Sequence, residues 1–157
     1  MRRREFISLI TSAMAWPFAA RGQAGKVYRI GVLEPTPAVQ NATNLNALRD
    51  GLRKLGYVEG QNLVIEYRSA DGRAERFPDL ASELVRLKVD AVVTRGTPAV
   101  QAAQQASGTI PIIMAQDSDP VGNGFVASLA HPGGNITGLS NLSSELSGKQ
   151  LELLKEI

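Results

Sequence analysis

The sequence predicts an α/β fold, in which helices pack on both faces of a parallel β-sheet. From residue 26 onward, short apolar runs alternate with amphipathic segments, which is the pattern of repeated β-α units. The loops between these segments are short, and no low-complexity tract follows the first 24 residues. With 157 residues, 43% apolar and 20% charged, the composition is that of an ordinary globular chain of about one domain.

Five apolar runs are predicted to be strands. The run at 63–68 alternates apolar and polar residues, which is typical of an edge strand, whereas 89–93 is almost continuously apolar, as expected for a strand buried on both faces. The predicted strands are residues 28–33, 63–68, 89–93, 110–115 and 135–139. We expect them to form a five-stranded parallel sheet in the order 2-1-3-4-5, within a Rossmann or flavodoxin-like three-layer sandwich.

Two amphipathic segments predict the first helices. In 44–55, leucines recur every three or four residues while charged residues fill the opposite face, and Gly56 supplies a left-handed cap. The segment 74–87 has a similar apolar face. Pro78 is tolerated only in a first helical turn, so this second helix is expected to begin near that residue.

Three further helices are predicted in the second half of the chain. Thr97 is expected to be the N-cap of a helix that has Pro98 at its first position and extends to Ser107. Another helix is predicted over 121–129. Ser144 is expected to cap the last helix.

The first 24 residues are typical of an export signal. Three arginines precede an apolar stretch over 6–20, and the small residues before Ala24 suit a signal peptidase that cleaves after it. A membrane anchor is disfavoured, because a spanning helix needs about 20 apolar residues and this stretch is shorter and interrupted by polar residues and Pro17. Arg3 and Arg4 also match the twin-arginine export pattern, although Sec export fits nearly as well.

The charge and the cysteine count exclude several functions. Of 17 basic and 15 acidic residues, the leader holds 4 and 1, so 13 basic and 14 acidic residues follow it. A nucleic-acid partner is therefore not expected. Without cysteine there is no disulfide, thiolate metal site or lipid anchor, and we expect a free periplasmic protein without a metal.

Three loops are predicted to meet at one edge of the sheet. The carboxyl ends of parallel strands share an edge, and ligands collect in the crevice there. The candidate binding residues are Glu34, Pro35 and Thr36 after the first strand, Gly96 and Thr97 after the third, and Asp117 and Asp119 after the fourth. A helix starting at Thr97 would offer N–H groups to an anion, and either aspartate could contact an amino group. The alternatives are an ordinary capped helix and a turn that opens the next helix.

A glycine motif raises a second class of function. Gly122, Gly124 and Ala127 match the spacing of a dinucleotide fingerprint, but that fingerprint directly follows a first strand, and these residues follow the fourth. His131 lies in a loop far from any candidate nucleophilic serine, which disfavours a catalytic triad. We therefore expect neither an enzyme nor a cofactor, with a secreted nucleotide-binding flavodoxin-like enzyme as the alternative.

Six motifs occur in order along nearly all of the chain after the leader. They are GLRKLGYVEGQNL at 51–63, ASELV at 81–85, GTPA at 96–99, DPVG at 119–122, PGGNITG at 132–138 and LELLKE at 151–156. Together they closely resemble the substrate-binding family of ABC transporters, of the tryptophan and tyrosine importer type. The resemblance implies a type I periplasmic-binding-protein fold, in which two α/β lobes close on a small solute without catalysis.

The resemblance also implies partners and a domain arrangement. The partners would be the permease and ATPase subunits of an importer, with membrane contact only through the permease. Family members are longer than this sequence, so we interpret residues 25–157 as the first lobe of a truncated chain that lacks the second lobe. The solute would be small and polar, such as an amino acid. A ligand-sensing lobe without a transporter is a further alternative.

Overall fold

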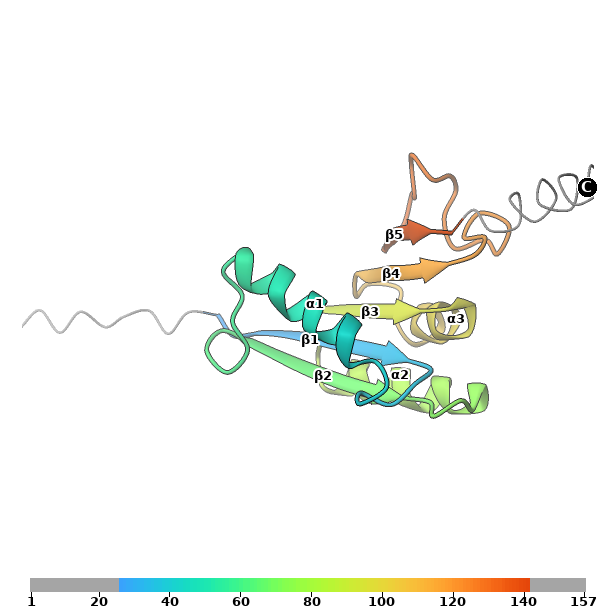
Figure 1. The fold of residues 1–157 in the computed structure, drawn as a ribbon. Helices are drawn as coiled ribbons and strands as arrows, with labels where there is room; N and C mark the ends of the chain where they lie inside the picture. Colours follow the sequence, from blue (N-terminus) through green and yellow to red (C-terminus); the bar gives the residue numbers. More distant parts are fainter. Residues whose placement is uncertain (1–25, 142–157) are drawn as a thin grey trace, which may run out of the picture.

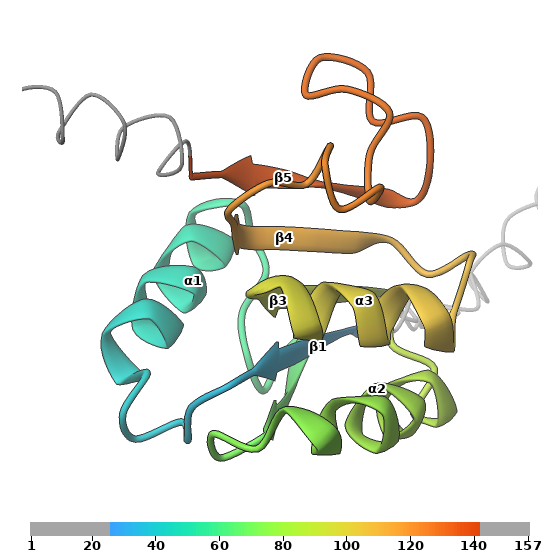
Figure 2. The ribbon, with the colours of Figure 1, turned by 90° about the vertical axis from the view of Figure 1, so that its right-hand side faces the viewer.

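The computed structural model describes residues 26–141, which form three layers (Figures 1 and 2). Within this range, five strands form one sheet: β1 (Tyr28–Glu34), β2 (Leu63–Ser69), β3 (Ala91–Arg95), β4 (Ile112–Asp117) and β5 (Ile136–Ser140). All neighbouring strands are parallel, in the order β2-β1-β3-β4-β5. The predicted fold class, sheet order and edge position of β2 are confirmed.

Helix α1 (Ala42–Lys54) lies on one face of the sheet, and α2 (Phe77–Arg86) and α3 (Thr97–Ala106) lie on the other (Figure 2). A short 3₁₀ helix, η1 (Ala74–Arg76), precedes α2. Pro78 lies in the first turn of α2, as predicted, because its missing N–H would have no helical partner there.

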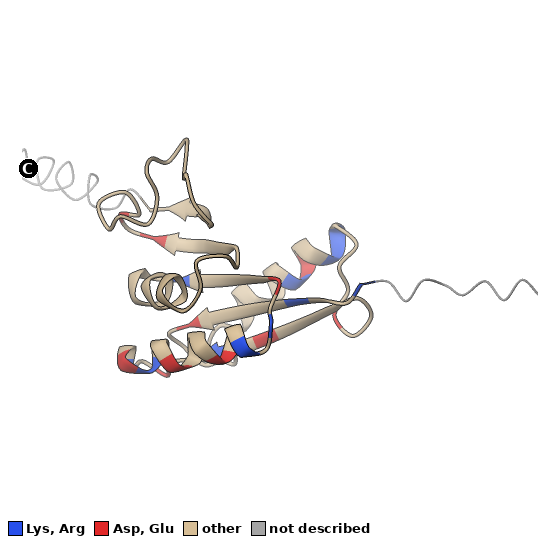
Figure 3. Ribbon diagram, turned by 180° about the vertical axis from the view of Figure 1, so that it is seen from behind, with Lys and Arg blue, Asp and Glu red and all other residues tan. Residues whose placement is uncertain are grey.

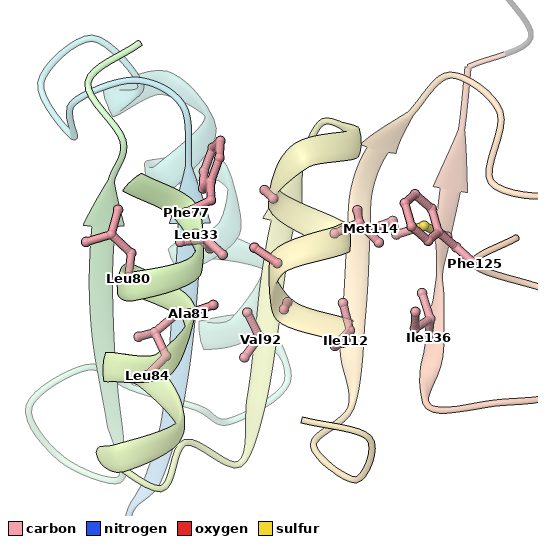
Figure 4. Close-up of a cluster of buried hydrophobic side chains, with 14 of the residues drawn as sticks. Leu33, Phe77, Leu80, Ala81, Leu84, Val92, Ile112, Met114, Phe125 and Ile136 are labelled. Carbon is pink, nitrogen blue, oxygen red and sulfur yellow. The ribbon is translucent and has the colours of Figure 1, made fainter. Parts of the chain in front are cut away.

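The main core lies between the sheet and the pair α2 and α3 (Figure 4). Leu84 of α2 is fully buried, and its side chain packs directly over Gly31 of β1, where a Cβ atom would approach Leu84 to 2.9 Å. Phe125 and Val126, from the connection between β4 and β5, complete the core beside Met114 (Figure 4 labels Phe125 and Met114). Apolar burial therefore holds this connection against the sheet.

The predicted helix over 121–129 is wrong. The segment makes a single turn and then reverses, because Gly124 has a left-handed φ of 72°. The N–H of Phe125 donates to the carbonyl of Pro120, and the N–H of Gly124 donates to that of Val121. These two bonds form the motif that terminates helices, so the turn ends as soon as it begins. The helix predicted from Ser144 and the export signal lie outside the described residues.

Many of the charged residues lie on α1, α2 and the β1–β2 side of the sheet (Figure 3). On β2, Glu66 binds Arg29 of β1 at 2.6 Å, and Arg68 binds Glu83 of α2 at 2.9 Å. Charges along an edge strand discourage pairing with another chain, and β2 is an edge strand of this sheet.

Strand β4 contains a β-bulge near its carboxyl end. Thr94 pairs with Met114, but the next residue of β3, Arg95, pairs with Gln116, so Ala115 is an extra residue. In a regular strand, Met114 and Asp117 would point to opposite faces. The extra residue brings Asp117 to the face covered by α3.

Candidate functional site

A cleft of about 360 Å³ opens at the carboxyl edge of the sheet, toward which the arrowheads in Figure 1 point. The residues that line it come from the β1–α1 loop, the end of β3 and start of α3, the end of β4, and the residue after β5. They are Pro35, Thr36, Arg95, Gly96, Thr97, Gln116, Asp117, Ser118 and Asn141. Its volume lies near the lower end of the range of small-molecule sites, about 300–1,000 Å³.

The structure brings five of the seven predicted site residues to this cleft: Pro35, Thr36, Gly96, Thr97 and Asp117. Glu34 and Asp119 are not among its lining residues. Glu34 is only 4% exposed and lies behind the wall. The Asp119 carboxylate accepts the N–H of Gly122 at 2.8 Å, as in the turn considered for it, but this turn opens no helix over 121–129.

This contact also bears on the glycine motif. Phosphate-binding glycine loops work by presenting free N–H groups to the ligand. Here the Gly122 N–H already donates to Asp119, and a side chain at Gly122 would clash with that carboxylate. The arrangement disfavours a nucleotide at this motif.

Thr97 does not have the capping role predicted for it. Gly96, with φ 84° and ψ 149°, is the N-cap, and Thr97 is the first residue of α3. The Thr97 hydroxyl donates instead to Oδ2 of Asp117 at 2.9 Å. In the first turn, Pro98 has no N–H and Ala99 donates to the Gly96 carbonyl, whereas no hydrogen-bond partner is found within residues 26–141 for the Thr97 N–H.

Asp117 is a buried carboxylate that joins three parts of the site. It is 1% exposed and accepts the Thr97 hydroxyl, the N–H of Asp119 at 3.0 Å and the Asn123 amide at 3.4 Å. These bonds connect the end of β4 to the start of α3 and to the turn after β4. Contact with a ligand's amino group stays a prediction. It would use the remaining lone pairs of the carboxylate, which can accept further hydrogen bonds.

Arg95 is the main residue that the sequence analysis missed. It is the last residue of β3, and its Nε donates to Oε2 of Glu34 at 2.6 Å while Nη2 donates to the Thr36 hydroxyl at 3.1 Å. An arginine directly before the Gly96 turn was a visible signal, because it lies just after the predicted strand 89–93, at the edge where ligands are expected to collect. Gln116, Ser118 and Asn141 were also missed.

Tyr67 of β2 makes a second set of hydrogen bonds that fixes the β1–α1 loop. The Tyr67 hydroxyl donates to the Thr36 carbonyl at 2.7 Å and accepts from the Asn41 amide at 3.3 Å. Burial raises the pKa of Tyr67 above its ordinary value of 10.0, against the opposing effect of the Asn41 hydrogen bond. The hydroxyl therefore stays protonated and keeps its donor bond to the loop.

Two other features are absent from residues 26–141. No three His, Asp or Glu side chains in this range come together in a way that could hold a metal ion. No helix within the same range is long and apolar enough to cross a membrane.

The comparisons with known proteins agree with this architecture. A sequence model of the ABC transporter substrate binding protein family matches residues 30–157. A tyrosine-binding protein of Clostridioides difficile is 40% identical over 106 residues, which are 68% of this chain and 30% of that protein.

Parts of two solved structures have a fold similar to that of this chain. A conserved domain protein of Vibrio cholerae has a TM-score of 0.74 and 36% identity, over 84% of this chain and 44% of that one. A Streptococcus ABC domain in complex with L-Trp has a TM-score of 0.65 and 34% identity, over 72% of this chain and 38% of that one.

This chain belongs to the ABC transporter substrate binding protein family. It spans less than half the length of each of these three relatives. The family resemblance expected from the sequence motifs is confirmed.

Proposed function

We propose that this chain is the first lobe of the solute-binding component of an ABC importer, and that it captures a small polar solute such as an amino acid. The observation that carries the proposal is the cleft at the carboxyl edge, whose wall contains both a cation, Arg95, and an anion, Asp117. An amino acid has one group of each charge, so such a wall complements its head group.

Two relatives support an amino acid as the solute. One is a tyrosine-binding protein, and another was solved in complex with L-Trp. The described part of the cleft wall contains no aromatic side chain. Stacking on an aromatic solute would therefore come from residues outside this wall.

The proposal extends to partners and location. The solute would be delivered to the permease and ATPase subunits of an importer, and this lobe would bind it without catalysis. The leader, in which three arginines precede an apolar stretch, supports export to the periplasm, and the absence of cysteine supports a free protein.

The test is a thermal-shift screen of the full-length gene product against the amino acids, other small metabolites and nucleotides. A bound solute raises the melting temperature by mass action, and isothermal titration then gives its affinity. Stabilisation by an amino acid is the expected result. Stabilisation by nucleotides alone, or by no solute, would contradict the proposal.

A pair of variants links binding to the cleft. Ser118→Trp places a bulky side chain at an exposed residue of the cleft wall, and we expect it to abolish the stabilisation. Ser82→Trp changes an exposed serine on α2, which does not line the cleft, and should bind like the wild type. Equal binding by both variants would show that the solute lies elsewhere.

A further inference from the structure

Arg95 lies where a cation can meet a solute directly. It ends β3, and the register pairs Leu33 with Thr94, so Arg95 and Glu34 follow as neighbours on adjacent strands. Thr94 is 0% exposed and, like Val92 two residues earlier, points to the face of the sheet that α2 and α3 cover. Arg95, the next residue, points to the other side, where 26% of its side chain is exposed at the cleft.

The guanidinium group of Arg95 is held along one edge. Its Nε donates to Glu34, and its Nη2 donates to the Thr36 hydroxyl and more weakly, at 3.4 Å, to Asn41 Oδ1. Among residues 26–141, no hydrogen-bond partner is found for Nη1 of Arg95. An arginine has five N–H donors in a planar fork, so donors remain on the edge away from Glu34.

Glu34 fixes the direction of this fork. Its side chain is only 6% exposed and lies 2.6 Å from Arg95 Nε. A buried carboxylate needs a cationic partner, and a charge-assisted bond of this length leaves the guanidinium little freedom to turn. Thr36 and Asn41, themselves tied to Tyr67, restrict it further.

The charge and geometry of the Arg95 guanidinium determine which ligand group it can bind. Within the described part of the chain, Arg95 is the only cationic side chain that lines the cleft. The Nη1 donors of a guanidinium held in this way match a carboxylate, with which they form charge-assisted hydrogen bonds. The Thr97 N–H, at the positive end of α3, lies on the same wall.

We infer that Arg95 binds the carboxylate of the solute and that Glu34 is a positioning residue that aims the Arg95 guanidinium into the cleft. This inference rests on the proposed function, because it assigns one half of the amino-acid head group to a particular side chain. The ammonium group of the solute is then oriented away from Arg95.

The experiment measures the affinity of the full-length protein for L-tryptophan and L-tyrosine, and for tryptamine and tyramine, which lack the carboxylate. The wild-type protein should bind each amino acid at least about tenfold more tightly than the matching amine. Arg95→Met should weaken amino-acid binding by about ten- to a hundredfold and leave amine binding unchanged, so the preference for the carboxylate disappears.

Three more variants separate recognition from folding. Arg95→Lys keeps the charge but loses the fork, and should bind amino acids with intermediate affinity. The double variant Glu34→Gln with Arg95→Met leaves no unpaired buried charge, and should lose amino-acid affinity as Arg95→Met does. Glu34→Gln alone should reduce the ratio of amino-acid to amine affinity, whereas a purely structural role would lower both affinities together.

Arg68→Met is the matched control. Arg68 is also a strand arginine with 26% of its side chain exposed, and it binds Glu83 at 2.9 Å, but it does not line the cleft. We expect this variant to bind like the wild type. Far-UV circular dichroism and melting temperatures verify that each variant is folded.

The outcomes distinguish the two proposals. If the wild-type protein binds no solute, or nucleotides alone, the proposed function fails and the inference falls with it. If it binds only a solute that has no carboxylate, the proposed function stands and the assignment of Arg95 is overturned. If the wild-type protein binds an amino acid but accepts the matching amine equally well, or if folded Arg95→Met or the double variant keeps wild-type affinity, the proposed function stands and the assignment of Arg95 is overturned.

Discussion

Replacing Thr97 by valine tests whether its hydroxyl supports the fold. Valine has nearly the shape of threonine but lacks the donor that reaches Asp117 Oδ2 at 2.9 Å. Because Asp117 is 1% exposed, water has little access to the oxygen that loses its partner. A hydrogen bond to a charged group contributes about 1.5–3 kcal/mol, and we expect Thr97→Val to lower the free energy of unfolding by that amount.

The assay is urea unfolding followed by circular dichroism, with Thr97→Ser as the control. Serine keeps the hydroxyl, so its loss of stability should stay below about 1 kcal/mol. A double-mutant cycle with Asp117→Asn should give a coupling energy of about 0.5–3 kcal/mol. A Thr97→Val protein within about 0.5 kcal/mol of the wild type would show that Asp117 does not engage the hydroxyl.

Three further predictions concern packing, backbone space and pH. Leu84→Ala should lower the free energy of unfolding by about 2–5 kcal/mol in the same urea assay, because Leu84 is fully buried. Gly138→Ala should cost more than about 2 kcal/mol or prevent soluble expression, because its φ is 143° and a Cβ atom would lie 2.6 Å from the backbone nitrogen of Met114. A near-wild-type Gly138→Ala protein would argue against this pairing of β4 and β5. The Lys26 hydrogen bond lowers the pKa of Asp90 below 3.8, so this carboxylate stabilises the fold above about pH 4 and loses that effect as the pH falls through its lowered pKa. Urea unfolding at several pH values should therefore show Asp90→Asn less stable than the wild type at pH 7 and equal to it in strong acid.

The elements could be predicted because their causes are local. The leucine spacing of α1, Pro78 in the first turn of α2 and the apolar runs of the strands lie within windows of a few residues. The one wrong helix, over 121–129, shows the limit of such patterns. Its apolar residues Phe125 and Val126 are buried in the core, although they follow a single turn that ends at Gly124. Their burial therefore does not require a helix.

The binding edge could be predicted in outline for a similar reason. The carboxyl ends of parallel strands meet at one edge, so the loops after β1, β3 and β4 had to lie near one another. Five of the seven predicted residues line the cleft there, although their contacts with a ligand stay predictions. Glu34 was predicted to be a binding residue, whereas in the structure it is 4% exposed, does not line the cleft and binds Arg95.

By itself, the sequence determined the class of fold, the order of its strands and the edge at which ligands collect, because each follows from local periodicity and from the topology of parallel β-α units. Only the tertiary structure decided which side chains act together. The bulge at Ala115 turns Asp117 toward Thr97, and the register of β1 on β3 places Glu34 beside Arg95, 61 positions away in the chain. Strand register and bulges depend on pairing between distant segments, and no spacing within one segment records them.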